Sequence, residues 1–265
     1  MISVIQLGTV DYETAVRLQR SLVELRHSGR IPNVLLLLEH PPVITMGRNA
    51  NQRNVLAVPD VLKSEGVAVF ECDRGGDVTY HGPGQLVGYP IFDLRSFRKP
   101  EMEEDIPPEA GRKTLGAIEY VRRLEEALIR TCADLGVAAA RVPKLTGVWT
   151  TTDPQAKIAA IGVHISRGIT SHGFALNVNT DLRHFGLIVP CGIQSKPVTS
   201  LSRETRAFVS MDTVAESVAR NFGRVFQSQI LWVETLDALL GRSVDIPLKA
   251  PEEMRGLHGD EVSWA

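Results

Sequence analysis

The chain has 265 residues, of which 43% are hydrophobic, and its 29 Lys and Arg against 31 Asp and Glu give a formal net charge of -2. This length corresponds to one large domain or two small ones, and the apolar content is that of an ordinary globular protein rather than a disordered one. The balanced charge argues against a nucleic-acid-binding protein, which usually carries a strong basic excess.

The sequence offers no segment that would span or enter a membrane. The longest aliphatic run, residues 34–38, is far shorter than the roughly 18 apolar residues that a membrane-spanning helix needs. Residues 1–11 lack the basic start and apolar stretch of a signal peptide. The three cysteines, without CxxC spacing, argue against a disulfide framework or a cysteine-rich zinc site. We therefore expect a protein of the reducing cytoplasm.

The first hundred residues alternate between short strands and helices. The pattern predicts strands over residues 3–7, 34–38, 43–46, 67–71 and 86–94, and helices over residues 11–26 and 60–65. Asp11 suits the N-cap of the first helix. The continuous apolar run at 34–38 is typical of a strand buried on both faces. Between the last two strands, residues 74–85 contain four glycines and one proline and predict a loop.

The second part of the chain continues the alternation. A polar loop is predicted over residues 96–113, followed by a helix over 114–135 whose apolar stripe includes Ile118 and whose buried face includes Cys132. Strands over 157–165 and 172–178 predict an antiparallel hairpin, and helices follow over 212–228 and 231–240. We expect an α/β (α+β) fold with mixed pairing, a catalytic domain over 1–242 and a tail over 243–265.

The hairpin places a lysine and a cysteine within reach of one another. Lys157 lies at its open end, and the chain needs only eleven more residues beyond Thr180 to reach Cys191. Strand alternation would put Ala159 and Ile161 on the face of Lys157, where an apolar floor would desolvate the amine. A neighbouring lysine can activate a cysteine thiol as a nucleophile. A single loop thiol or strand-end lysine is more often structural, so the pairing is a hypothesis.

Two further features are open to more than one interpretation. The glycine-rich segment fits neither the P-loop nor the GxGxxG pattern, which leaves a substrate cradle or a tight surface turn. His81 within it could orient a substrate, transfer a proton or serve the structure. His164 and His172 could face each other across the hairpin, but no third ligand is evident, so we expect no metal.

Several blocks of the sequence together resemble a known family. They are RGGDVTYHGPGQLVGYP at 74–90, GVW at 147–149, KIAAIG at 157–162, HGFALNVN at 172–179, PCGI at 190–193 and TSL at 199–201. In this order and at these distances they are similar to the octanoyl-acyl carrier protein:protein N-octanoyltransferases of lipoate biosynthesis. The similarity spans roughly residues 30 to 205.

The resemblance implies a fold like that of biotin and lipoate protein ligases, with a mixed β-sheet flanked by helices. It implies that Cys191 is the acyl-thioester nucleophile, that Lys157 activates it, and that no cofactor is needed. It also implies substrate contacts at Arg74, Gly75, Gly76, Asp77, Val78, Thr79, Tyr80, His81, Ala160, Ile161, Gly162, Gly173, Phe174 and Ala175.

The resemblance further implies the partners of the reaction. The donor would be octanoyl-acyl carrier protein, and the acceptors would be lysines of the lipoyl domains of 2-oxoacid dehydrogenase complexes and of the glycine cleavage H protein. We expect a monomer. The alternatives are an ATP-dependent lipoate or biotin protein ligase of the same fold, a thioesterase or amidase that uses water as acceptor, and a non-catalytic acyl or carrier-protein binding module.

Overall fold

The computed structural model describes residues 1–97, 115–190 and 196–240. Within these residues, eight strands form a mixed sheet in the order β11-β1-β2-β6-β10-β9-β8-β7. Their bounds are β1 Ile2–Thr9, β2 Asn33–Glu39, β6 Gln85–Ile91, β7 Ala139–Val142, β8 Leu145–Thr150, β9 Lys157–Ser166, β10 Ile169–Asn177 and β11 Ile230–Trp232. The pairs β11/β1 and β1/β2 are parallel and the others antiparallel, which confirms the expected mixed pairing.

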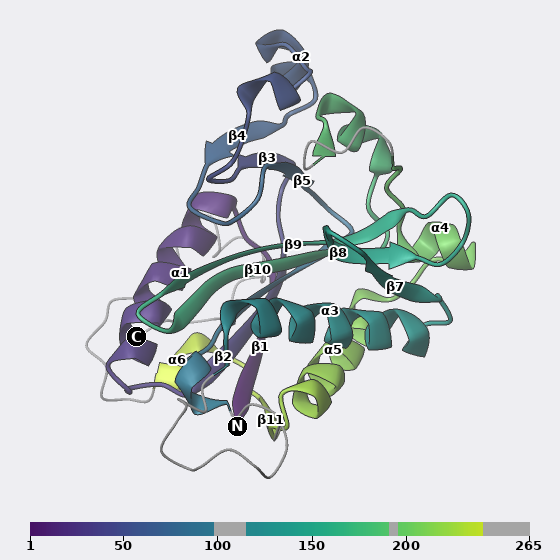
Figure 1. Cartoon of the computed structure of the whole chain (residues 1–265). Coiled ribbons are helices and arrows are strands. Elements are labelled where there is room, and N and C mark those ends of the chain that lie inside the picture. The colour runs from purple at the N-terminus through teal and green to yellow at the C-terminus, as the bar shows by residue number, and fades with distance from the viewer. Residues whose placement is uncertain (98–114, 191–195, 241–265) are drawn as a thin grey trace, which may run out of the picture.

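Helices cover both faces of this sheet (Figure 1). The helices α3 (Ala117–Asp134) and α5 (Met211–Val225) pack on one face, and α1 (Tyr12–His27) packs on the other. The strand β2 is buried over both faces along its apolar run, as its sequence predicts. Asp11 caps α1 as expected, since its side chain accepts a hydrogen bond from the Thr14 backbone at 2.9 Å.

A smaller sheet stands above the α1 face of the large one (Figure 1). It consists of β4 (Ala68–Glu71), β3 (Val43–Met46) and β5 (Val78–His81), with the short helix α2 (Pro59–Ser64) beside it. Its apolar core also takes in side chains from the 3₁₀ helix Leu182–Leu187. The strands of this sheet therefore bring the glycine-rich segment over the hairpin β9–β10.

Several sequence predictions need correction. The predicted strand over 86–94 ends at Ile91, since Asp93 caps a 3₁₀ turn over Leu94–Ser96. The predicted helix over 231–240 is instead strand β11 followed by α6 (Leu236–Leu240), because Ile230 to Trp232 pair with β1. Ile118 is 80% exposed, because six residues place it about 120° around α3 from the buried Leu124.

Other predictions hold or lie outside the described residues. Cys132 is fully buried in the core of α3, as expected. The hairpin is antiparallel, and its turn is tighter than predicted because Arg167 and Gly168 both adopt positive φ. The predicted loop over 96–113 falls mostly outside the described residues, and so does the boundary between domain 1–242 and tail 243–265. In the described part of the chain, no helix is long and apolar enough to cross a membrane.

Candidate active site

The glycine-rich loop is fastened directly onto the hairpin. The Gly75 backbone donates a hydrogen bond to the Val163 carbonyl at 2.9 Å. A Cβ atom at Gly162 would lie only 2.7 Å from the Gly75 carbonyl oxygen, so the close approach requires glycine at position 162. The guanidinium of Arg74 donates to the Thr45 carbonyl at 2.6 Å and to its hydroxyl. These contacts hold the loop across the strands and leave a cavity between the two sheets.

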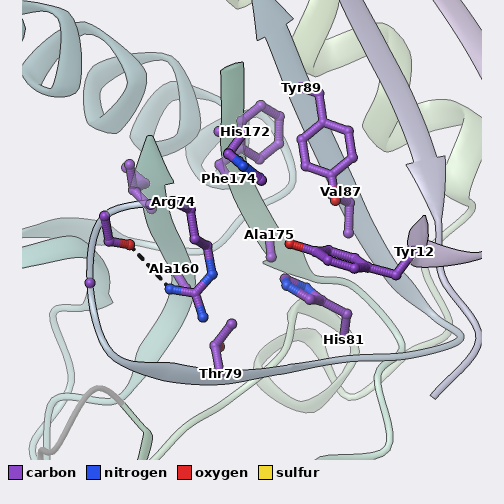
Figure 2. Close-up of a pocket in the computed structure, with 15 residues that line it drawn as sticks. Tyr12, Arg74, Thr79, His81, Val87, Tyr89, Ala160, His172, Phe174 and Ala175 are labelled. Atoms are coloured by element: carbon purple, nitrogen blue, oxygen red, sulfur yellow. Dashed lines mark hydrogen bonds between the residues drawn. The ribbon is translucent and has the colours of Figure 1, made fainter. Parts of the chain in front are cut away.

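This cavity, which we call the acyl pocket after the octanoyl group that the resemblance implies, encloses about 450 Å³ when the open solvent at its mouth is included. Figure 2 shows its lining, which comes from α1, the glycine-rich loop, β5, β6 and the hairpin. Eleven of the fourteen predicted substrate residues line it, namely Arg74, Gly75, Gly76, Thr79, His81, Ala160, Ile161, Gly162, Gly173, Phe174 and Ala175.

The remaining three predicted substrate residues do not line the pocket. Val78 and Tyr80 alternate with Thr79 and His81 along β5, so they point into the core of the small sheet instead. The Asp77 carboxylate accepts hydrogen bonds from the backbone of Asn51 and Val78 and from the Asn54 side chain. It therefore stabilises the local turn.

Sequence reasoning did not single out four lining residues, Tyr12, Val87, Tyr89 and His172, as substrate contacts. Val87 and Tyr89 alternate along β6 on the buried pocket face, a signal that the sequence does carry. Tyr12 is the first residue of α1, and no local pattern points it into a pocket. His172 has φ of +54° and donates its backbone N–H to Gln19 rather than following regular strand geometry.

Burial keeps His81 of the pocket and its neighbour His40 neutral. Burial lowers the pKa of His81 well below its ordinary value, and its Nδ1 donates to the Gln85 side-chain oxygen at 2.7 Å. Burial also lowers the pKa of the neighbouring His40 to about 4. His40 Nδ1 donates to the Val10 carbonyl at 2.6 Å, so its Nε2 accepts from the Tyr89 hydroxyl at 2.7 Å. Both imidazoles therefore act as fixed hydrogen-bonding groups.

The Tyr12 hydroxyl makes no hydrogen bond to a nitrogen or oxygen atom of the described residues, although the residue is only 4% exposed, and it interacts with the weakly bonding Cys72 thiol. Figure 2 shows its ring over His81 and its hydroxyl pointing into the pocket. Burial is the main reason that the pKa of this hydroxyl is raised, so the hydroxyl stays protonated at neutral pH. The group is thus a neutral donor or acceptor in an otherwise largely apolar space.

Lys157 lies beside the acyl pocket in a second, smaller cavity. The nine residues that line this cavity are Thr79, Gln85, Lys157, Ala160, Ala175, Asn177, Phe185, Pro190 and Val198. Thr79, Ala160 and Ala175 also line the acyl pocket, so the two cavities share walls. Lys157 is only 6% exposed. Its backbone forms hydrogen bonds with the backbone of Pro197 and Thr199, and these bonds hold residues 197–199 alongside β9.

The floor around Lys157 differs from the one predicted by simple alternation. Val148 pairs with Ala159 but Trp149 pairs with Lys157, so a β-bulge adds one residue to β9 at this point. Lys157 therefore shares its cavity with Ala160, whereas Ala159 lies in the core on the α3 side. Ile161 packs against that core and also lines the acyl pocket.

Cys191 lies outside the described residues. The residue directly before it, Pro190, lines the small cavity together with Lys157.

One carboxylate joins the two histidines of the hairpin. His164 pairs with Ser171 across the hairpin, so it does not face His172 directly. The Asp73 carboxylate accepts a hydrogen bond from each ring, at 2.8 Å from His172 Nε2. Over the described ranges, no group of three or more His, Cys, Asp and Glu side chains is arranged to hold a metal ion.

Comparisons with known proteins agree on the family of this chain. A model of the lipoyl protein ligase A/B catalytic domain matches residues 11–223. The chain is 57% identical over 262 residues to the octanoyltransferase of Koribacter versatilis, covering 99% of each chain. The chain belongs to the octanoyltransferase family. The octanoyltransferase of Acidobacterium capsulatum is 59% identical over 91% of this chain and 96% of that one. The family assignment makes this chain an acyltransferase of protein lipoylation.

Solved structures confirm the fold that an octanoyltransferase was expected to have. A bipartite lipoate protein ligase from Thermoplasma acidophilum has a TM-score of 0.65 at 17% identity, covering 90% of this chain and 89% of that one. A lipoate-protein ligase A solved with ATP has a TM-score of 0.61 at 18% identity, covering 89% of both chains. The octanoyltransferase family therefore shares its mixed sheet and flanking helices with the lipoate protein ligases.

Proposed function

We propose that this chain moves an octanoyl group from octanoyl-acyl carrier protein to a lysine of a lipoyl domain, through a thioester on Cys191. The observation that carries the proposal is the shared lining of the two cavities. Lys157 and Pro190 line the small cavity, and three of its walls also line the acyl pocket. An acyl chain in the pocket would therefore present its carbonyl carbon toward Lys157 and toward Pro190, the residue that precedes Cys191 in the sequence.

The reaction divides into two acyl transfers. In the first, the Cys191 thiolate attacks the thioester carbonyl, and the carrier thiol leaves with a proton. In the second, the acceptor amine attacks the Cys191 thioester, Cys191 leaves as thiolate, and the amine loses a proton. Lys157 takes up the thiol proton of Cys191 and later exchanges protons with the leaving and attacking groups. Conversion of a thioester to an amide is downhill, so the transfer needs no ATP.

The acyl pocket supplies binding energy for the chain. Burying the seven CH₂ and CH₃ groups of an octanoyl chain at about 0.8 kcal/mol each gives an upper bound of about 5 to 6 kcal/mol. Each missing methylene would then cost nearly a factor of four in affinity, on the order of what length selection needs. The glycines of the loop and hairpin allow the backbone to approach the chain closely.

Intact-mass measurement tests the first transfer. The protein mixed with octanoyl-acyl carrier protein should gain one octanoyl group that hydroxylamine removes, and Cys191→Ala should gain none. Cys72→Ala is the matched control, because Cys72 lies outside both cavities, and it should still form the adduct. An adduct that survives in Cys191→Ala, or no adduct in the native chain, would refute the thioester route.

The same reaction mixture, assayed also with and without ATP and acceptor domain, separates the alternatives. An ATP-dependent ligase would form no thioester and would require ATP for transfer. A thioesterase would release octanoate when no acceptor domain is present. A binding module would retain its function in both Cys191→Ala and Lys157→Ala.

A further inference from the structure

The side chain of Lys157 lies against the face of a buried tryptophan. Its Nζ atom is 4.8 Å from the centroid of the Trp149 ring. Trp149 is 1% exposed and Lys157 is 6% exposed, so little water screens the contact. An ammonium within about 6 Å of an indole centroid is attracted by the ring, and the attraction is strongest where the pair is desolvated.

The pairing of β8 with β9 and the glycine at position 147 keep Trp149 beside Lys157. Trp149 on β8 is the register partner of Lys157 on β9, next to the β-bulge. Two residues earlier, Gly147 has φ of +121°, and a Cβ atom there would lie 2.7 Å from the Ala159 carbonyl oxygen and 3.6 Å from Lys157 Cε. The Gly147 N–H donates to the fully buried Glu125 carboxylate at 3.1 Å. Strand β8 therefore leaves room at Gly147 for the aliphatic part of the Lys157 side chain and places the Trp149 ring beside its Nζ atom.

We propose that Trp149 is a positioning residue for Lys157, whose indole face holds the ε-ammonium in the small cavity beside the acyl pocket. Once Lys157 has taken up the thiol proton of Cys191, the ammonium held there can stabilise the negative charge that develops during acyl transfer. This inference rests on the proposed role of Lys157. It assigns to Trp149 the role of holding Lys157 in place without taking part in the bonds that form or break.

A second ammonium lies near the same ring and supplies a matched control. Lys196 Nζ is 5.7 Å from the Trp149 centroid and donates to the Gln155 side chain at 3.0 Å. If the ring served mainly to hold Lys196, removing the charge of Lys196 would remove the effect of the ring. Lys196→Met tests this without altering Lys157.

Fluorination of the indole weakens its attraction for a cation and changes its shape very little. The chain has three tryptophans, so the parent for this experiment is the double variant Trp232→Phe and Trp264→Phe. We expect kcat for octanoyl transfer to fall stepwise with fluorine number, by about threefold for one fluorine and about tenfold for four. The KM for octanoyl-acyl carrier protein should change little, and the same slope should appear in Lys196→Met.

A second readout does not depend on activity. In the parent labelled with ¹³C-lysine, the ε-methylene signal of Lys157 should be shifted upfield by the indole ring current, and Trp149→Leu should abolish the shift. A parent that transfers octanoyl normally but shows no fluorination slope would overturn the inference, as would a slope that vanishes in Lys196→Met. If the native chain transfers no octanoyl, the proposed function fails instead, and an absent upfield shift would still overturn the positioning role.

Discussion

The Nε2 atom of His172 donates a hydrogen bond to Asp73 Oδ1 at 2.8 Å, and this contact ties the glycine-rich loop to strand β10. The other oxygen of the same carboxylate accepts from His164 on strand β9. Hydrogen bonding to His172 is the main reason that the pKa of Asp73 lies well below its ordinary value. One carboxylate therefore links the loop that carries Arg74 and Gly75 to both strands of the hairpin.

Neutralising Asp73 should loosen this loop without removing a reacting group. The Asp73 side chain is 50% exposed, so its contacts with the two histidines contribute at most about 1 kcal/mol each. We expect Asp73→Asn to raise the KM for octanoyl-acyl carrier protein by about fivefold and to change kcat much less. Asp60→Asn, on the exposed surface of α2, is the control and should change neither parameter. A fall in kcat at constant KM would contradict this positioning role.

The close approach of loop and hairpin predicts a steric effect at Gly162. A methyl group there would lie 2.7 Å from the Gly75 carbonyl oxygen, so Gly162→Ala should push the loop outward and open the pocket. We expect at least a tenfold loss of kcat/KM, on the order of what a misplacement near 1 Å costs. Gly186→Ala serves as control, because an added Cβ there meets nothing within 4 Å. Equal kcat/KM values for the two variants would show that the loop can yield.

The sequence predicted the local elements well and the long-range contacts poorly. The run at 34–38 and the cap at Asp11 depend on neighbouring residues, and both predictions are confirmed. The extra residue in β9, the left-handed conformation of His172 and strand β11 depend on pairing between distant segments. Most residues that line the pocket could be predicted because they fall in sequence blocks that resemble a family. Tyr12 could not be predicted, because it lies on a helix outside these blocks.

The buried His40 predicts how stability depends on pH. Its pKa is lowered to about 4 by burial, whereas an unfolded histidine has a pKa of 6.5. The unfolded chain therefore binds the proton first as pH falls, so the stabilisation is complete above pH 6.5 and declines toward pH 4. The decline should amount to about 3 kcal/mol in the free energy of unfolding.

Urea unfolding between pH 7 and pH 4 measures this contribution. The native chain should lose stability over this range, and His40→Gln should show a clearly shallower slope. The exposed His27→Gln provides the control and should retain the native slope. An unchanged slope in His40→Gln would mean that other groups account for the pH dependence.

The hydroxyl of Tyr12 is buried beside the weakly bonding Cys72 thiol and makes no hydrogen bond to a nitrogen or oxygen atom of the described residues, so its removal should not impair folding. A buried polar group without a partner costs about 1 to 3 kcal/mol, so Tyr12→Phe should leave the free energy of unfolding unchanged or raise it by about 1 kcal/mol. The more apolar pocket should also lower the KM for the octanoyl donor. Thermal unfolding and steady-state kinetics check the two effects, and a destabilisation above about 1 kcal/mol would reveal a partner for this hydroxyl.

The central claim is that the acyl group passes through Cys191, and a single-turnover chase tests it most directly. The protein is loaded with radiolabelled octanoyl, freed of carrier protein, and mixed with a lipoyl domain without ATP. We predict that the label moves in one turnover from Cys191 to the acceptor lysine, where hydroxylamine no longer releases it. Label that stays on the protein, or appears only as free octanoate, would contradict the account.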